Sequence, residues 1–220
     1  GYLVGALVTA GVVRRWGTRI SFRAAMVLTA VSLAATALSD AYAVVLAVRA
    51  FSGVAGAVVF ITGAVIASRL ATRADSGRPI TVYFAGTGIG IAVSGAIIPA
   101  AGDHWRLVWL GLAIAGALAT VAGWTAASAG DDVQDAVSGR ARVRTLWRPA
   151  LAYLLFSAGY ITYITFLSAY LAAHGASREQ TTLTWIALGS AVLAAPALWR
   201  YPTEHWSGAR LLATLLTVLS

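Results

Sequence analysis

A single arginine interrupts a long apolar stretch of the sequence. Arg49 lies within residues 41–67, a run of apolar and small residues that contains no acidic side chain. A charged group at membrane depth costs roughly 3 kcal/mol or more unless it lies in a cavity or has a partner. We therefore predict that Arg49 faces a cavity, where it binds an anionic group or takes part in proton coupling. The alternative is a structural arginine that bonds to helix-end carbonyl groups or extends toward the membrane surface.

A second candidate surface is aromatic. Residues 150–173 carry several aromatic rings at steps of three or four, which places on one helix face Tyr153, Phe156, Tyr160 and Tyr163. Hydroxyl groups on such a face can line a substrate cavity. Tyr160 and Tyr163 are therefore candidates, with Arg49, for substrate binding or proton coupling. The alternative is that these rings face lipid or the protein core.

The composition sets the class of protein. Of the 220 residues, 59% are hydrophobic and 11% are charged, and the mean hydropathy is +0.78. An unfinished run begins at Leu211, after seven apolar runs at residues 1–13, 24–38, 41–67, 80–101, 107–127, 150–173 and 183–198. Runs this long and continuous favour helices over the alternating strands of a membrane barrel. The predicted fold is an all-α, polytopic transmembrane helix bundle.

The chain has a net charge of +8, and all 16 of its basic residues are arginines, since it has no lysine. These arginines separate the apolar runs and form no single basic face, which argues against nucleic-acid binding.

The absence of cysteine excludes disulfides, thiolate catalysis and cysteine-based metal sites. We expect no cofactor and no metal. The expected partners are the lipid bilayer, a small-molecule substrate and protons, and the protein is expected to be a monomer.

The arginines are distributed unevenly between the two sides of the membrane. Thirteen flank alternate connections, namely 14, 15, 19, 23, 69, 73, 78, 140, 142, 144, 148, 200 and 210, whereas the other side has only Arg106 and Arg178. This excess marks the first side as cytoplasmic, in a multi-pass protein of a bacterial inner membrane. The first helix would then run inward. We expect from this, and from the unfinished last run, that the chain is a piece of a longer protein.

Glycines indicate where helices approach one another. Gly86, Gly90 and Ser94 are spaced by four and share a helix face, and Gly95 follows. Small residues at this spacing allow close helix packing in lipid. We expect close packing there and at Gly53 and Gly56; a flexing or gating role is the alternative for the cluster at 86–95.

Residues 10–19 read Ala-Gly-Val-Val-Arg-Arg-Trp-Gly-Thr-Arg. This segment resembles the loop between helices two and three of the major facilitator superfamily, a motif associated with conformational change. Arg15, Gly17 and Arg19 match that motif. Arg14 stands where the superfamily pattern has aspartate.

Arg49 begins another pattern, in which Gly53 follows four residues later and small residues continue to Ala57. It resembles the helix-four motif of the same superfamily. The pair Trp105 and Arg106 resembles the start of helix six. Residues 1–7 and 153–171 resemble helices two and seven of its YbfB-like branch, so the chain is similar to that branch from helix two to the start of helix nine.

The resemblance implies a secondary transporter with two six-helix halves and a central cavity that opens alternately to each side, usually driven by protons or another solute. Residues 1–127 would form helices two to six, 128–149 a central cytoplasmic loop, and 150–220 helices seven, eight and the start of nine. The antiporter motif of helix five is absent, because Gly95 is followed by proline only at Pro99.

Two other functions compete with transport. An intramembrane serine protease would need a Gly-x-Ser-Gly turn and a histidine at membrane depth. Residues 92–95 match that turn in part, but no histidine lies in a predicted span, so we expect no enzyme activity. The other alternative is a truncated membrane fragment that transports nothing.

Overall fold

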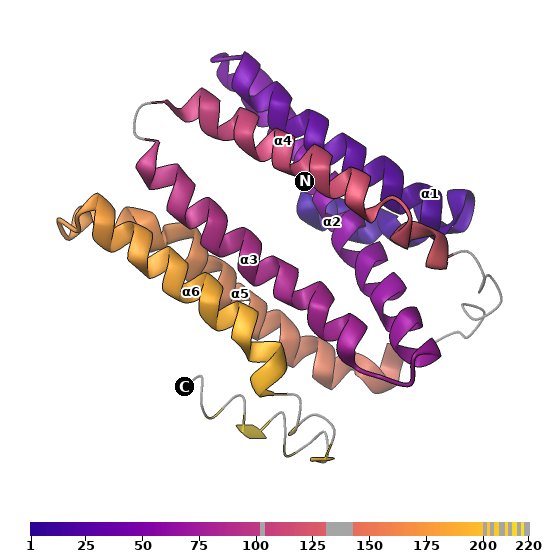
Figure 1. Ribbon diagram of the computed structural model, residues 1–220. Helices are drawn as coiled ribbons and strands as arrows, with labels where there is room; N and C mark the ends of the chain where they lie inside the picture. Colours follow the sequence, from indigo (N-terminus) through magenta and orange to yellow (C-terminus); the bar gives the residue numbers. More distant parts are fainter. Residues whose placement is uncertain are drawn as a thin grey trace.

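A computed structural model describes residues 1–101, 104–130 and 143–199, with isolated positions after residue 199. Within these residues the regular elements are all helices, shown in Figure 1: α1 (Tyr2–Leu38), α2 (Tyr42–Arg73), α3 (Arg78–Ala100), α4 (Trp105–Gly123), the 3-10 helix η1 (Ala126–Gly130), α5 (Val143–Ala173) and α6 (Arg178–Leu198). Of these, α1, α2, α3, α4 and α6 are long and apolar enough to cross a membrane. The predicted all-α transmembrane bundle is confirmed.

The helices extend beyond the predicted apolar runs. The segment after residue 13, predicted as a loop, is helical apart from a break at Gly17. Similarly, α2 continues to Arg73 and α5 begins at Val143. Arginine is a good helix former, and its long side chain can extend to the membrane surface from a helix end. Hydropathy therefore located the helices but made several of them too short. Residues 131–142 of the predicted central loop, and most of the predicted eighth run, lie outside the described residues.

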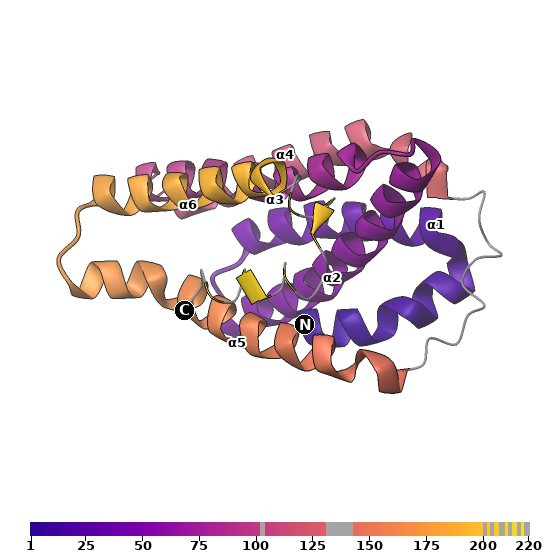
Figure 2. The same ribbon diagram turned by 90° about the horizontal axis from the view of Figure 1, so that it is seen from below.

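The break at Gly17 divides α1 into two segments that fold back on each other, as Figure 2 shows. Its φ of 77° and ψ of 162° lie in a region of backbone conformation that is essentially restricted to glycine. One residue thus makes the reversal for which the sequence predicted a longer loop.

Gly17→Ala is expected to destabilise the fold by about 1–3 kcal/mol, the usual cost of holding a side-chain-bearing residue in such a conformation. A Cβ atom at Gly17 has no other atom within 4 Å, so this cost comes from the backbone alone. Thermal unfolding in detergent measures it. Gly11→Ala is the matched control, because Gly11 is helical and equally uncrowded, and its alanine variant should be at least as stable as the wild type. Equal stability of the two variants would contradict the role given to Gly17.

The helices form two packed groups. In one, α1 packs against α2 and α4; in the other, α3 packs chiefly against α6 (Figure 1). Thus α3, from the predicted first half of the chain, lies against a helix of the predicted second half. The first group is closely packed, because a Cβ at Gly5 would lie 2.6 Å from the carbonyl oxygen of Val54 and one at Gly53 would lie 2.8 Å from the backbone nitrogen of Tyr2.

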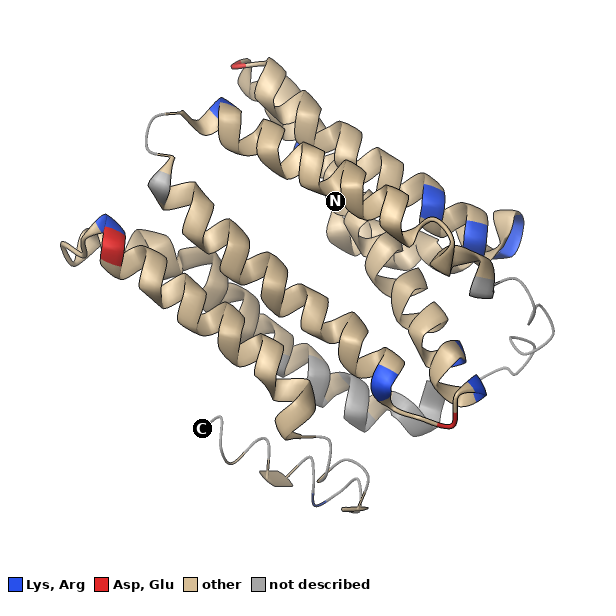
Figure 3. Cartoon of the chain, viewed as in Figure 1, with Lys and Arg blue, Asp and Glu red and all other residues tan. Residues whose placement is uncertain are grey.

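Most buried hydroxyl groups are satisfied within their own helices. Six of them donate to the carbonyl oxygen four residues earlier at 2.5–2.8 Å, namely those of Thr9, Ser21, Ser32, Thr36, Thr62 and Thr120, whereas the Thr18 hydroxyl accepts from Arg69 of α2. A bilayer has no water to satisfy a polar group, so this pattern suits a membrane protein. Figure 3 shows basic residues gathered at the end of the bundle where α1 folds back and where α2 meets α3.

Candidate functional site

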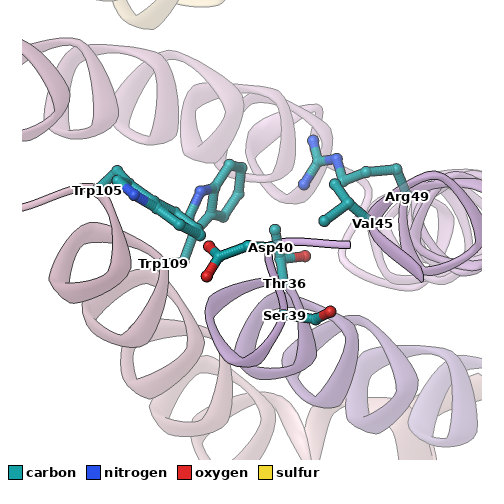
Figure 4. A pocket seen from close by; sticks show the side chains of 7 residues that line it. All are labelled: Thr36, Ser39, Asp40, Val45, Arg49, Trp105 and Trp109. Carbon is teal, nitrogen blue, oxygen red and sulfur yellow. The ribbon is translucent and has the colours of Figure 1, made fainter. Parts of the chain in front are cut away.

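Arg49 lies in a groove at the C-terminal end of α1, which is the end of its second segment away from the break at Gly17. The groove has a volume of about 390 Å³ and is lined by Thr36, Ser39, Asp40, Val45, Arg49, Trp105 and Trp109 (Figure 4). These residues come from the end of α1, the start of α2 and the start of α4. The site is therefore built by the short connection between α1 and α2, which holds Ser39 and Asp40, together with the first turns of α4.

The position of Arg49 follows from the way α2 begins. Ala41 is extended and precedes the first helical residue, Tyr42, and the backbone N–H of Ala41 donates to the Ser39 hydroxyl at 3.2 Å. Arg49 is two turns into α2, and its side chain extends toward α4 (Figure 4).

The guanidinium of Arg49 lies over an aromatic ring of α4. Its central carbon is 4.6 Å from the centroid of the Trp109 ring, a cation–π contact of the kind worth about 0.5–2 kcal/mol. Within the described part of the chain, Arg49 makes no hydrogen bond or ion pair. Its N–H donors are therefore available to a ligand in the groove. Trp109 was not predicted to be a site residue; its spacing of four from Trp105, on one face at the start of α4, was the available signal.

The carboxylate of Asp40 is engaged elsewhere. It forms an ion pair with Arg106, whose guanidinium lies 5.3 Å from the centroid of the Trp105 ring. The side chains of Arg106 and Asp40 are 54% and 66% exposed, so the pair contributes little stability. Because Asp40 pairs with Arg106, no acidic group among the described residues pairs with Arg49. A groove with such a cation favours an anionic ligand.

The predicted tyrosines are not part of this groove. Tyr160 and Tyr163 lie on α5 and are 40% and 55% exposed, and neither lines the groove at Arg49. The side chains of Tyr153 and Phe156 lie outside the described residues. A polar contact joins α5 to α6, where the indole N–H of Trp185 donates to the Ser168 hydroxyl at 3.0 Å.

Three glycines allow the close approach of α3 and α6. A Cβ at Gly88 would collide with the backbone of Leu193 and lie 2.7 Å from the carbonyl oxygen of Gly189, while one at Gly189 would lie 2.7 Å from the Cα of Ala92. A Cβ at Gly95 would collide with the side chain of Trp185, at its Cβ.

Three other glycines singled out in the sequence are uncrowded, unlike Gly53, which meets the start of α1. A Cβ at Gly56, Gly86 or Gly90 has no other atom within 4 Å. The face of α3 against α6 is therefore the one that contains residues 88, 92 and 95, whereas the predicted packing face contains residues 86, 90 and 94. Both spacings fit close packing, and only the position of α6 distinguishes them.

The loop-motif residues meet in a second pocket, where α1 folds back. Arg15, Gly17 and Arg19 line it, and its volume is about 540 Å³. Arg14 lines the same pocket, so the position that carries aspartate in the superfamily pattern here adds a further positive charge.

Long apolar helices, hydroxyl groups satisfied within helices and basic residues gathered at a helix end define a multi-pass membrane protein. The chain matches, over residues 1–220, the model of the family described as "uncharacterised MFS-type transporter YbfB". It belongs to this family of membrane transporters, as the motifs in its sequence predicted. No curated protein sequence and no solved structure matches the chain.

Proposed function

We propose that the protein is a secondary active transporter that moves a small solute by alternating access and couples this movement to protons. Membership in a transporter family supports the class. The observation that carries the site is Arg49, a cation in an open groove with an aromatic ring beside it.

Arg49 is proposed to bind an anionic group of the solute. A guanidinium can stack its flat face on an aromatic ring while its N–H edge makes two parallel hydrogen bonds to a carboxylate or phosphate. The Trp109 ring holds the guanidinium, and the groove beside it can admit a small anion. An alternative role for Arg49 is proton coupling. Tyr160 and Tyr163 would contribute hydroxyl groups of α5 to the solute pathway.

The proposed setting is a bacterial inner membrane, with the protein as a monomer and the arginine-rich ends of the helices in the cytoplasm. The positive-inside rule supports this orientation. The Arg49 groove, at the end of α1 away from Gly17, would then lie toward the outer side.

Reconstituted vesicles test this function. The purified protein in proteoliposomes is given an imposed pH gradient and a panel of radiolabelled small carboxylates and phosphate esters. We expect accumulation of one class of solute, which a protonophore abolishes and Arg49→Gln strongly reduces. If the solute only equilibrates across the membrane, at a rate that does not depend on the pH gradient, proton coupling would be contradicted. If no anionic solute moves at all, the proposed solute class is wrong.

A further inference from the structure

Two adjoining pockets lie away from the Arg49 groove, one around the break of α1 at Gly17 and the other along the second segment of α1. The first is the arginine-rich pocket, lined by Arg14, Arg15, Trp16, Gly17, Arg19, Ile20 and Arg23. The second is an apolar groove of about 620 Å³ along α1, bordered by Trp124 just after the end of α4 and lined by Ile20, Arg23, Ala24, Val27, Leu28, Val31 and Trp124. Ile20 and Arg23 line both, so the two pockets form one continuous surface that is cationic at one end and apolar along the rest.

The cationic end is strongly positive. Four arginines and no acidic side chain line it, and Arg14 and Arg15 are exposed. Neither of these two makes an ion pair with any residue in the described ranges. Two exposed guanidinium groups thus line the same pocket, which suits a bound phosphate group.

Arg23 is fixed at the junction of the two pockets. Its Nε–H donates to the carbonyl oxygen of Trp124 at 3.0 Å, and its guanidinium lies 4.5 Å from the centroid of the Trp124 ring. These contacts tie α1 to the end of α4, where unsatisfied helix carbonyls favour a cation. The boundary between the charged and apolar parts of the surface is therefore held in place.

The apolar groove has the length of one membrane leaflet. Ala24, Val27, Leu28 and Val31 follow at steps of three, one and three on one face of α1, and Val27, Leu28 and Val31 are 43%, 43% and 57% exposed. From Ile20 to Val31 the helix rises about 16 Å, close to half of the roughly 30 Å hydrocarbon core of a bilayer.

We propose that an anionic phospholipid binds this surface, with its phosphate at Arg14 and Arg15 and an acyl chain along the groove to Val31. Charge complementarity, the junction at Arg23 and the leaflet-length groove each fit this ligand. A free anion would use only the arginines, and a second protein chain would not need a phosphate site. The lipid site lies apart from the Arg49 groove, so its existence does not depend on the proposed transport function.

Tryptophan quenching measures binding at this surface directly, because Trp16 and Trp124 line its two parts. The purified full chain in a neutral detergent is titrated with phosphatidylglycerol carrying brominated acyl chains, and with brominated phosphatidylcholine as the zwitterionic comparison. We expect phosphatidylglycerol to bind at least tenfold more tightly. Replacing Trp124 with Phe should remove part of the quenching, and its persistence in full would overturn the assignment of the acyl chain to this groove.

Charge removal gives the decisive comparison. Arg14→Gln with Arg15→Gln should weaken phosphatidylglycerol binding roughly 30-fold, since each arginine near a lipid surface contributes about a fivefold factor. Arg73→Gln with Arg78→Gln removes two charges at the α2–α3 turn and should change the affinity less than about twofold. The double lysine variant, Arg14→Lys with Arg15→Lys, should stay within about fivefold of the wild type, which shows that the segment folds. Equal losses for the two glutamine pairs would overturn the proposal.

Two further experiments distinguish a bound lipid from a free anion and from a second protein chain. Inorganic phosphate at the lipid's concentration should not displace it, and Ala24→Phe, which fills the apolar groove, should weaken lipid binding at least tenfold. Displacement by phosphate would overturn the proposal in favour of a free-anion site. If Ala24→Phe changes the oligomeric state in solution but not the lipid affinity, the groove is a contact between chains and the proposal fails.

Discussion

Gly88→Ala is expected to destabilise the protein by about 1–3 kcal/mol, the usual cost of inserting a carbon atom into a well-packed interior. The added Cβ would meet the backbone of α6 at Leu193 and Gly189. Backbone atoms cannot rotate away as a side chain can, so α3 and α6 must move apart. Thermal unfolding in detergent measures the effect. Gly189→Ala, at the facing position, should be similarly damaging, and the two effects should not add, because both variants open the same contact.

Gly90→Ala is the matched control for this prediction. Gly90 lies on the same helix two residues later, and a Cβ there has no other atom within 4 Å. Alanine is the better helix former by about 1 kcal/mol, so this variant should be as stable as the wild type or more stable. If Gly88→Ala and Gly90→Ala unfold at the same temperature, α3 and α6 do not pack through Gly88.

Arg49→Gln is expected to weaken the binding of an anionic solute by about 30-fold or more. Loss of one partner of a desolvated charge pair costs about 2–5 kcal/mol. Arg49→Lys should retain part of the affinity, because lysine keeps the charge but loses the planar, two-point hydrogen bonding. Trp109→Leu should cost about fivefold, the value of one cation–π contact near 1 kcal/mol. Solute-dependent thermal stabilisation over a panel of carboxylates and phosphate esters gives these affinities, since a ligand raises stability with the logarithm of its concentration relative to its Kd.

Arg178→Gln is the control for the loss of one positive charge. Arg178 begins α6 and lines a different pocket, near Pro99. It should alter the affinity less than about twofold. An Arg49→Gln variant that binds the anionic solute as tightly as the wild type would remove Arg49 from the site.

The helices were largely predictable because apolar runs of this length have few other structures in lipid. Each of the seven predicted runs overlaps an α-helical segment, with the two segments of α1 accounting for the first two runs. Their ends were less predictable. A hydropathy pattern stops at the first arginine, whereas the helix continues past Arg14 and Arg15 and past Arg69.

The contacts between helices were not predictable to the same degree. Two faces of α3 carry small residues at packing distance, and the sequence cannot show which one meets another helix. The answer depends on α6, about a hundred residues later, whose Gly189 opposes Gly88 and Ala92. Similarly, the sequence shows that Arg49 needs a partner but not that Trp109, sixty residues later, lies beside it.

The roles of Arg49, Tyr160 and Tyr163, and the division of the chain at residues 128–149, stay predictions. Arg49 has a groove and an aromatic neighbour that fit its proposed role. The two tyrosines lie on a separate helix, outside that groove. Their role therefore depends on how the solute pathway continues beyond it.

A single cysteine in the Arg49 groove tests most directly whether this groove is part of an alternating-access pathway. The chain has no cysteine of its own, and Val45 lines the groove one turn before Arg49. Val45→Cys is labelled with a membrane-impermeant thiol reagent, added to right-side-out or inside-out vesicles under opposite pH gradients. We predict labelling from both sides, with the preferred side changing when the gradient is reversed. Labelling from one side only, at a rate that ignores the gradient, would contradict transport through this groove.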